Sequence, residues 1–325
     1  MKYRPLGKSG ISVSEIGFGA WAIGGAMDVH GMPVGWGRTD DAQSIAAMER
    51  SRDLGVNFFD TSDVYGNGHS EELIGKCPKL KDCFVATKVG NKITATSAVK
   101  DFSPGHIRSA LEGSLKRLRR ETIDLYQLHN PPPEIWKSDD VFGQLAQLKS
   151  EGKIRLAGVS ITTMEEGIHL IEKRKADCLQ VLFNILNQEP AKQLIPLAQK
   201  RGVGIVVRVP LASGLLTGKF SANTTFPKDD NRSNYLNPKR LQEALSCVQR
   251  VQALARDSGF TLTQLALAFI LKSSPANVPI PGAKTAKQAE ENISAAGLSL
   301  DDALFAKIKE EVGDYNFFLR YAVRV

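Results

Sequence analysis

Four residues that can hold or move a proton stand at, or shortly after, the ends of short apolar runs. The run 58–59 leads into Asp60, and Tyr65 follows in the same segment. The run 84–87 leads into Lys88, and the run 123–128 leads into His129. Short apolar runs of this kind predict buried strands. If the three strands are parallel neighbours, the four side chains converge on one face of the sheet.

Such a group would suit the protonation of a carbonyl oxygen while another molecule supplies a hydride. Tyrosine normally has a pKa of about 10, and a nearby ammonium group stabilises the phenolate and lowers that pKa. Lys88 would be the ammonium, and Asp60 would keep it charged and oriented. His129 could orient a carbonyl group or relay a proton. Each residue alone has an ordinary alternative, because loops and strand ends also carry rim aromatics and solvated polar side chains.

The composition is that of an ordinary globular protein. The chain has 325 residues, of which 42% are hydrophobic and 24% are charged. That length allows a sizeable core, and barrels of this size form one domain, so we expect a single domain over 1–325. No apolar run approaches the ~20 residues of a membrane span. The segment 1–5 is not followed by an apolar stretch, so we expect neither a signal peptide nor a membrane partner.

The net charge is +7 and the isoelectric point is about 9.1. Basic residues alternate with acidic ones, and the densest basic cluster, 116–120, is typical of a solvated helix end. We therefore expect no nucleic-acid partner, whereas an anionic small molecule fits a mild basic excess.

The four cysteines, Cys77, Cys83, Cys178 and Cys247, form no Cys-x-x-Cys pair, and no histidine lies at zinc-finger spacing. We therefore expect no metal site. Unpaired cysteines in apolar runs are typical of a reducing compartment, which predicts a cytoplasmic location.

Strand and helix patterns alternate along the chain after an N-terminal hairpin over 2–13. The predicted strands are 16–19, 56–60, 84–88, 123–128, 154–159, 178–183, 204–209 and 277–280. The predicted helices are 40–54, 70–76, 103–119, 139–150, 164–174, 190–201, 239–257, 261–272, 285–295 and 301–312. In the first helix we expect Ile45, Met48 and Leu54 on one face. Two long loops, 20–39 and 210–237, interrupt the alternation, and loops of this length are usually functional or mobile.

This alternation predicts a closed (β/α)8 TIM barrel whose N-terminal end is covered by the hairpin. In such barrels the active-site residues lie at the carboxyl ends of the strands. The prediction places there the residues Asp60, Lys88, His129, Ser160, Asn184, Arg208 and Gly282.

The chain resembles the aldo-keto reductases over nearly its full length. The matching segments, taken together in this order, are 55–66 (GVNFFDTSDVYG), 87–88 (TK), 124–129 (DLYQLH), 152–155 (GKIR), 210–218 (PLASGLLTG) and 280–284 (IPGAK). The resemblance implies an NADPH-dependent carbonyl reductase on a (β/α)8 barrel. It assigns a catalytic tetrad to Asp60, Tyr65, Lys88 and His129, with Tyr65 as the general acid.

The resemblance also implies where the cofactor binds. Contacts to the nicotinamide amide fall on Ser160 and Gln180, and the loop segment supplies Pro210, Leu211 and Gly214. Gly282, Ala283 and Lys284 stand where a helix begins, which suits phosphate binding, and Lys284 would meet the 2′-phosphate of NADPH or NADP⁺. Adenine and ribose contacts fall on Gln288, Glu291 and Asn292, which share a helix face.

Two positions depart from the family pattern. Ile161 replaces the asparagine that often follows Ser160, so we expect the contact with the amide either to be thinner or to be re-made by Asn184. Arg208 replaces a tyrosine that stacks on the nicotinamide in many members. A guanidinium group is planar and can stack, although it also brings positive charge to the ring.

Two other function classes compete with the reductase. One is a regulatory protein of the same fold that binds NADPH and acts mainly through a partner; the complete tetrad favours the enzyme instead. The other is a Schiff-base aldolase that uses Lys88, which Asp60 disfavours because the lysine would have to be neutral. The substrate is expected to be a small carbonyl compound or alcohol in a pocket of Trp21, Trp36, Tyr65 and His129, with Pro131 nearby. The oligomeric state is left open.

Overall fold

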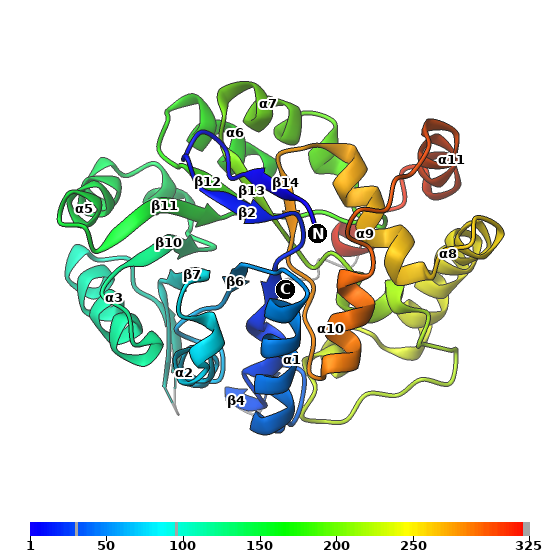
Figure 1. The fold of residues 1–325 in the computed structure, drawn as a ribbon, viewed down its shortest axis with the longest axis horizontal. Helices are drawn as coiled ribbons and strands as arrows, with labels where there is room; N and C mark the ends of the chain where they lie inside the picture. The colour runs from blue at the N-terminus through cyan, green and yellow to red at the C-terminus, as the bar shows by residue number, and fades with distance from the viewer. Residues whose placement is uncertain (30–31, 95–96, 321–325) are drawn as a thin grey trace.

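Eight parallel strands form one continuous sheet in the computed structural model, which describes residues 1–29, 32–94 and 97–320 (Figure 1). Along the sheet the strands are β14 (Asn277–Pro279), β13 (Gly204–Arg208), β12 (Cys178–Leu182), β11 (Ile154–Ser160), β10 (Ile123–His129), β7 (Phe84–Val89), β6 (Phe58–Asp60) and β3 (Phe18–Gly19). The two edge strands meet, because the Gly17 amide donates to the Pro279 carbonyl (2.9 Å) and the Gly19 amide donates to the Pro281 carbonyl (3.1 Å). The sheet therefore closes, and the predicted (β/α)8 barrel is confirmed.

Helices surround the strands on the outside (Figure 1). They are α1 (Asp41–Asp53), α2 (His69–Lys76), α3 (Pro104–Leu118), α4 (Pro133–Trp136), α5 (Asp139–Ser150), α6 (Met164–Glu172), α7 (Leu194–Arg201), α8 (Pro238–Asp257), α9 (Leu262–Ser273), α10 (Ala286–Ile293), α11 (Asp302–Val312) and α12 (Phe317–Arg320). Their starts follow from capping chemistry: the Asp40 side chain accepts from the Gln43 amide, and Ser103 precedes Pro104 at the first position of α3. In the described part of the chain, no helix has both the length and the apolarity needed to cross a bilayer.

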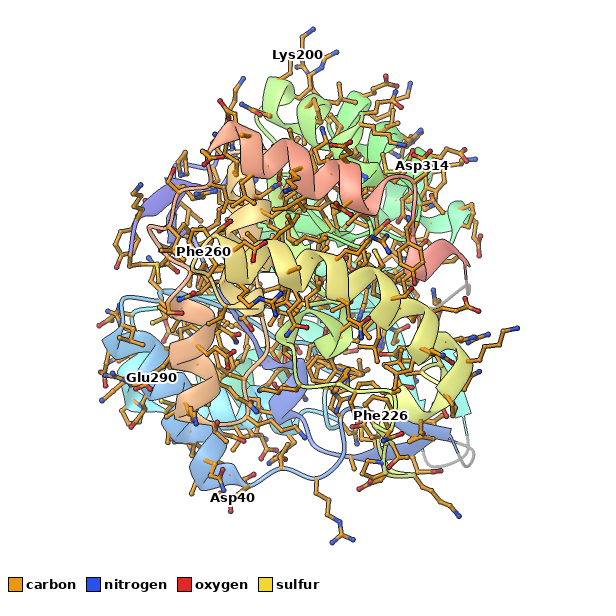
Figure 2. All side chains as sticks on the ribbon, turned by 90° about the vertical axis from the view of Figure 1, so that its right-hand side faces the viewer. Asp40, Lys200, Phe226, Phe260, Glu290 and Asp314 are labelled. Atoms are coloured by element: carbon orange, nitrogen blue, oxygen red, sulfur yellow. The ribbon has the colours of Figure 1, made fainter. Side chains whose placement is uncertain are left out.

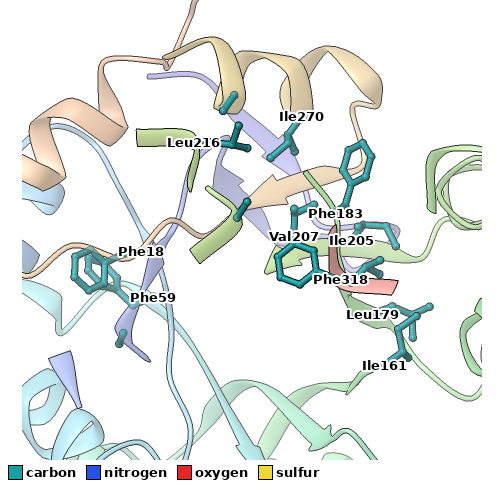
Figure 3. Close-up of a cluster of buried hydrophobic side chains, with 14 of the residues drawn as sticks. Phe18, Phe59, Ile161, Leu179, Phe183, Ile205, Val207, Leu216, Ile270 and Phe318 are labelled. Carbon is teal, nitrogen blue, oxygen red and sulfur yellow. The ribbon is translucent and has the colours of Figure 1, made fainter. Parts of the chain in front are cut away.

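A continuous apolar core lies between the strands and the helices. Outward-facing strand residues such as Phe59, Leu179 and Val207 pack there with helical residues such as Ile270, all of them fully buried (Figure 3). Phe18 and Phe59, from the neighbouring strands β3 and β6, have ring centroids 5.6 Å apart. This core holds the strand ends rigid, so side chains that project from those ends have defined positions.

The N-terminal hairpin closes one end of the barrel. Its strands β1 (Tyr3–Pro5) and β2 (Ser12–Ser14) are antiparallel, and Leu6, Ile11 and Val13 pack on inward-facing barrel residues such as Phe58 and Leu125. The Lys8 amide donates to the Gly202 carbonyl just after α7, so the hairpin lies at the same end as Lys200. Figure 2 shows Lys200 at one end of the molecule, and Asp40 and Phe226 at the opposite end, where the carboxyl ends of the strands open.

Several predicted boundaries need correction. The loop expected over 20–39 contains a short 3-10 helix, Ala20–Ile23, and an antiparallel pair of strands, β4 (Met27–Val29) and β5 (Met32–Val34). A second hairpin, β8 (Asn91–Thr94) with β9 (Ser97–Lys100), follows β7 where no element was predicted. Pro190 does not open the helix before Arg201 but lies in a separate 3-10 turn, Glu189–Ala191. The loop expected over 210–237 carries the 3-10 turns Ala212–Thr217 and Asn231–Asn234.

The three residues expected on one face of the first helix, Ile45, Met48 and Leu54, all pack against the core. Ser44, Ala47, Met48 and Ser51 are buried, whereas Ile45 and Leu54 are only partly buried. The helix α1 also packs against α10.

Candidate active site

Strand alternation produces a polar layer above an apolar one inside the barrel. Phe58, Ala86, Leu125 and Cys178 belong to the apolar cluster that the hairpin covers. Side chains repeat on the same face of a strand every second residue, so the inward positions two residues later are Asp60, Lys88, Gln127 and Gln180. All four are buried, with at most 2% of each residue exposed. The barrel therefore brings polar side chains from four strands together at its open end, and two of them, Asp60 and Lys88, can carry charge.

Lys88 links two of the predicted tetrad residues. Its Nζ atom donates to Asp60 Oδ1 (2.5 Å), to the Thr61 carbonyl (2.7 Å) and to the Tyr65 phenolic oxygen (3.1 Å). An ammonium group has three donors, so these three contacts use all of them. The lysine is thus held in one position directly beside the phenol.

Asp60 has further partners that the sequence prediction did not include. Its second carboxylate oxygen, Oδ2, accepts from Gln127 Nε2 (3.0 Å) and from Gln180 Nε2 (2.7 Å). Gln180 was expected to contact a nicotinamide amide, and here its side-chain amide nitrogen orients Asp60. Gln127 was missed, although its place two residues before His129 on β10 is a signal that could have identified it.

A tight contact between two turns positions Tyr65. Gly66, which follows Tyr65, has a φ of +63°, and a Cβ atom there would lie 2.0 Å from the Gly24 carbonyl oxygen, so a larger residue is excluded. This contact brings the turn after Tyr65 against the 3-10 helix that carries Trp21. The rings of Trp21 and Tyr65 meet edge to face, with centroids 4.7 Å apart. Trp21 therefore forms a wall of the pocket beside the phenol.

The pKa values of this group follow from burial and from pairing. Burial acts to lower the pKa of Lys88, but the Asp60 carboxylate and Tyr65 outweigh it, and the pKa lies above its ordinary value. Burial raises the pKa of Tyr65, and Lys88 opposes that rise without overcoming it. The expectation that Lys88 would bring the pKa of Tyr65 below its ordinary value is therefore wrong for this structure. Tyr65 is a protonated phenol at neutral pH, which is the form that a proton donor requires.

His129 lies at the end of β10, and its ring centroid is 6.0 Å from that of Tyr65. Its Nδ1 atom is 3.2 Å from Ser62 Oγ, so Nε2 is the ring nitrogen that remains for a ligand. Burial, with the positive charges of Lys88, Arg208 and Lys100, holds the pKa of His129 well below its ordinary value. The ring is therefore neutral at neutral pH.

A pocket of about 830 Å³ opens above these residues. Four residues predicted at or near the site, Lys88, Pro131, Asn184 and Ala283, do not line it, and the others do. These are Trp21, Trp36, Asp60, Tyr65, His129, Ser160, Gln180, Arg208, Pro210, Leu211, Gly214, Gly282, Lys284, Gln288, Glu291 and Asn292. The structure thus brings together in one cavity residues that are dispersed along most of the chain.

One predicted contact near Ser160 needs correction. Asn184, expected to replace the missing asparagine, turns away: its Nδ2 atom donates to the Val209 carbonyl and its Oδ1 atom accepts from the Leu186 amide. Asn130 lies there instead, and its Oδ1 atom accepts from Ser160 Oγ (3.0 Å). Asn130 follows His129 directly, so it reaches Ser160 from the neighbouring strand β10.

Arg208 lines the pocket near Tyr65. Its guanidinium donates to the Ile161 carbonyl (3.4 Å), and burial lowers its pKa to about 10. The guanidinium therefore stays charged at neutral pH, at the position where the family pattern often has a tyrosine.

Lys284, which precedes α10, contacts the loop segment that carries Trp36. Its Nζ atom donates to the carbonyl oxygens of Trp36 and Arg38, and its backbone amide donates to Gln288 Oε1. Glu291 accepts from Thr263 Oγ1, and Asn292 donates to the Gly282 carbonyl. The predicted adenosine-site residues therefore lie in the segment before α10 and along α10 itself, and the segment that carries Trp36 contacts Lys284.

The pocket mouth contains charged residues that the sequence prediction missed. Arg232 pairs with Asp230, and its guanidinium lies 5.3 Å from the Trp36 ring centroid. Lys219 also lines the pocket, as does Lys100 from the unpredicted β8–β9 hairpin. The charge of Asp60 is neutralised by Lys88. Positively charged side chains therefore outnumber unpaired carboxylates among the residues that line the pocket. This charge balance fits the phosphates of a dinucleotide.

The chain was compared with known proteins. The family model described as aldo/keto reductase family matches residues 15–312. The aldo-keto reductase YhdN of Bacillus subtilis is 32% identical over 310 residues, which cover 93% of this chain and 90% of that protein. The NADH-specific methylglyoxal reductase of Escherichia coli is 30% identical over 320 residues, covering 93% and 96%. The solved structure of the glycerol dehydrogenase AKR11B4 from Gluconobacter oxydans superposes with a TM-score of 0.82 and 30% identity, covering 99% and 97%. The chain is a member of the aldo/keto reductase family.

Proposed function

We propose that this protein reduces an aldehyde or a ketone to the corresponding alcohol, reversibly and with NADPH as its reductant. The observation that carries the proposal is the buried contact of Lys88 Nζ with both Asp60 and the Tyr65 phenol at the floor of the pocket. A protonated phenol beside an ammonium can give a proton to a carbonyl oxygen, because the ammonium stabilises the phenolate that remains. The proposed catalytic residues are Asp60, Tyr65, Lys88 and His129. We also propose that residues 1–325 form one domain.

Each proposed catalytic residue would have its own role in the reaction. Tyr65 would donate the proton to the carbonyl oxygen, and Lys88 would stabilise the phenolate. Asp60, itself held by Gln127 and Gln180, would keep Lys88 charged and in place. His129 is neutral, and Ser62 contacts its Nδ1 atom, which leaves Nε2 for a ligand. His129 would therefore position the carbonyl oxygen. The reduced nicotinamide, when bound, supplies the hydride.

Members of this family use nicotinamide cofactors, and the choice between NADPH and NADH is the finer part of the proposal. Support for NADPH comes from Lys284 at the start of α10, whose ammonium could pair with a 2′-phosphate. That ammonium must first leave the carbonyl oxygens of Trp36 and Arg38. The NADH-specific methylglyoxal reductase of Escherichia coli shows that a relative can use the other cofactor.

We propose that the nicotinamide half is held by Ser160, Gln180, Arg208, Pro210, Leu211 and Gly214. For the adenosine half we propose Gly282, Ala283, Lys284, Gln288, Glu291 and Asn292.

We propose a small carbonyl compound or alcohol as the substrate. Trp21 forms an aromatic wall beside Tyr65, the proposed proton donor, and Trp36 also lines the pocket. Relatives that act on methylglyoxal and glycerol make small aldehydes, ketones and polyols the first compounds to test. A cytoplasmic location fits the four free, buried cysteines.

The test is a panel of aldehydes, ketones and polyols, assayed with NADPH and with NADH by the change in nicotinamide absorbance. The proposal predicts turnover that is faster with NADPH and that Tyr65→Phe abolishes or strongly reduces. Tight NADPH binding without turnover of any compound would instead favour the regulatory alternative. A substrate adduct on Lys88 that borohydride traps would favour the aldolase, but the raised pKa of Lys88 disfavours that chemistry because a Schiff base requires a neutral amine.

A further inference from the structure

We propose that Ser62 and Asp63 set which nitrogen of His129 carries the proton, and that they form a reversible relay between His129 and the protein interior. This inference rests on the proposed function, because it assigns His129 two different roles toward the bound substrate. Both residues lie in the turn between Asp60 and Tyr65, and neither belongs to the proposed tetrad.

The relay is a chain of two hydrogen bonds. Ser62 Oγ lies 3.2 Å from His129 Nδ1 and donates to Asp63 Oδ1 at 3.0 Å. Ser62 is fully buried. A hydroxyl group has one proton to donate, so while Ser62 donates to Asp63 it can only accept from His129. Nδ1 then carries the imidazole proton, and Nε2, the nitrogen that remains for a ligand, is a bare acceptor.

Protonation of Asp63 would reverse both hydrogen bonds. When Nε2 takes up a proton, the Nδ1 proton moves to Ser62, and the hydroxyl proton of Ser62 moves to Asp63. The imidazole stays neutral, Asp63 gains the one added proton, and no other co-reactant is required. Asp63 then donates to Ser62, Ser62 donates to Nδ1, and Nε2–H becomes a donor toward the pocket.

The surroundings of Asp63 support such a protonation near neutral pH. Burial raises the pKa of Asp63 to about 7, and the neighbouring Glu71 adds to the rise. The hydrogen bond from Ser62, the charge of Arg117 and the Val64 amide oppose it.

Four elements, α2, α3, β7 and β10, carry the groups around the turn that contains Asp63. Glu71 on α2 accepts from Arg117 on α3 (2.6 Å) and from Thr87 on β7 (2.5 Å). The fourth element is β10, which carries Tyr126 and His129; the phenol of Tyr126 donates to the Ile107 carbonyl. Lys88 on β7 contributes its backbone carbonyl to the Asp63 amide.

His129 cannot absorb the proton itself in this range. Burial and the charges of Lys88, Arg208 and Lys100 hold the pKa of His129 well below its ordinary value. The ring must therefore exchange one neutral tautomer for the other rather than become an imidazolium. A pH change across neutrality would alter the hydrogen-bonding role of Nε2 without adding charge beside the substrate.

The two forms suit the two directions of the proposed reaction. A carbonyl oxygen accepts hydrogen bonds, so the Nε2–H form would hold an aldehyde or ketone. An alcohol can donate, so the bare Nε2 form would accept a hydrogen bond from its hydroxyl group. Lower pH thus favours binding of the carbonyl compound, and higher pH favours binding of the alcohol.

The test is a pH titration of the full-length protein, uniformly labelled with ¹⁵N, by long-range ¹H–¹⁵N correlation of the histidine rings. The chain has five histidines, and the signals absent in His129→Gln identify the ring in question. A group with a pKa near 7 changes its ratio of protonated to ionised forms by about 100-fold between pH 6 and pH 8. We expect His129 to change from the Nε2–H to the Nδ1–H tautomer over the same interval.

Two variants and one control define the outcome. Asp63→Asn and Ser62→Ala should each leave the His129 tautomer independent of pH between pH 6 and pH 8. Glu166→Gln is the control, because Glu166 is another buried carboxyl whose pKa burial raises to about 7, but it bonds Thr162 and not the relay. It should leave the His129 titration unchanged. A wild-type His129 that keeps one tautomer throughout, or a titration that survives in Asp63→Asn, would overturn the proposal. The spectra need no turnover, so this result is separate from the outcome of the activity panel.

Discussion

The Nζ atom of Lys88 lies between Asp60 and Tyr65, 2.5 Å from the carboxylate oxygen and 3.1 Å from the phenol. Lys88 is completely buried, and a buried ammonium survives only where partners replace its lost hydration. The pair with Asp60 supplies that compensation, and the contact with Tyr65 makes the same ammonium available to a phenolate. The same buried ammonium group thus pairs with Asp60 in the barrel interior and takes part in the proposed proton transfer through its contact with Tyr65.

Replacing Tyr65 with Phe removes the proposed proton donor and keeps the ring that packs against Trp21. General acid catalysis is worth roughly 10²–10⁴-fold, so kcat for the best carbonyl substrate should fall by about that factor. NADPH affinity, measured by fluorescence titration, should stay near the wild-type value. A variant that reduces its substrate at close to the wild-type rate would remove Tyr65 from the mechanism.

Replacing Lys88 with Met should change the pH dependence of the reverse reaction. Alcohol oxidation requires the Tyr65 phenolate as a base, so its rate should rise with pH as the phenol ionises. Lys88 is the largest influence that opposes the burial-driven rise in the pKa of Tyr65. Its loss should therefore raise that pKa further and move the oxidation profile to higher pH. An unchanged profile would show that Lys88 does not act on the titrating group.

Replacing Asp60 with Asn should destabilise the fold, because it leaves the Lys88 ammonium buried without its counter-charge. Breaking a buried pair by removing one partner typically costs about 3–5 kcal/mol, which urea unfolding would measure. Asp53→Asn is the matched control: its partner is Lys79, and each side chain of that pair is 46% exposed. An exposed pair contributes about 0–1 kcal/mol. Equal losses in both variants would argue against the buried pair as the cause.

Replacing Lys284 with Glu tests the cofactor preference. The change should weaken NADPH binding, because a carboxylate repels the 2′-phosphate, and it should leave NADH binding nearly unaltered. Lys287→Glu, at an exposed position on α10 just after Lys284, makes the same charge change away from the proposed site and should alter neither affinity by much. Equal losses for NADPH and NADH in Lys284→Glu would count against the assignment. Equal losses would indicate instead that the contacts of Lys284 with Trp36 and Arg38 hold the binding site in place for both cofactors.

Replacing Arg208 tests whether its planar group lies against the nicotinamide. Tyrosine also offers a flat surface, so Arg208→Tyr should keep more NADPH affinity than Arg208→Ala. Isothermal titration of both variants against the wild type would measure the difference. If Arg208→Ala binds NADPH as tightly as the wild type does, the stacking interpretation fails.

The sequence by itself determined the barrel and the strand-end positions of the proposed catalytic group. Each strand is a short apolar run, and the alternation of strand and helix leaves few other ways to bury those runs. Asp60 and Lys88 were predictable because they lie on or at the end of such runs, and the two-residue period of a strand sends them inward with Gln127. Local patterns of this kind are present in the order of residues, so they can be recognised without coordinates.

Only the tertiary structure decided what those side chains meet. Asn130 rather than Asn184 reaches Ser160, and Lys284 meets the carbonyl oxygens of Trp36 and Arg38. These partners lie on different loops, whose relative positions depend on packing and not on any local period. The direction of the pKa shift of Tyr65 has the same origin, because burial outweighs the neighbouring charge of Lys88. Burial is a property of the whole fold, and for that reason the sequence predicted the group but not its electrostatic state.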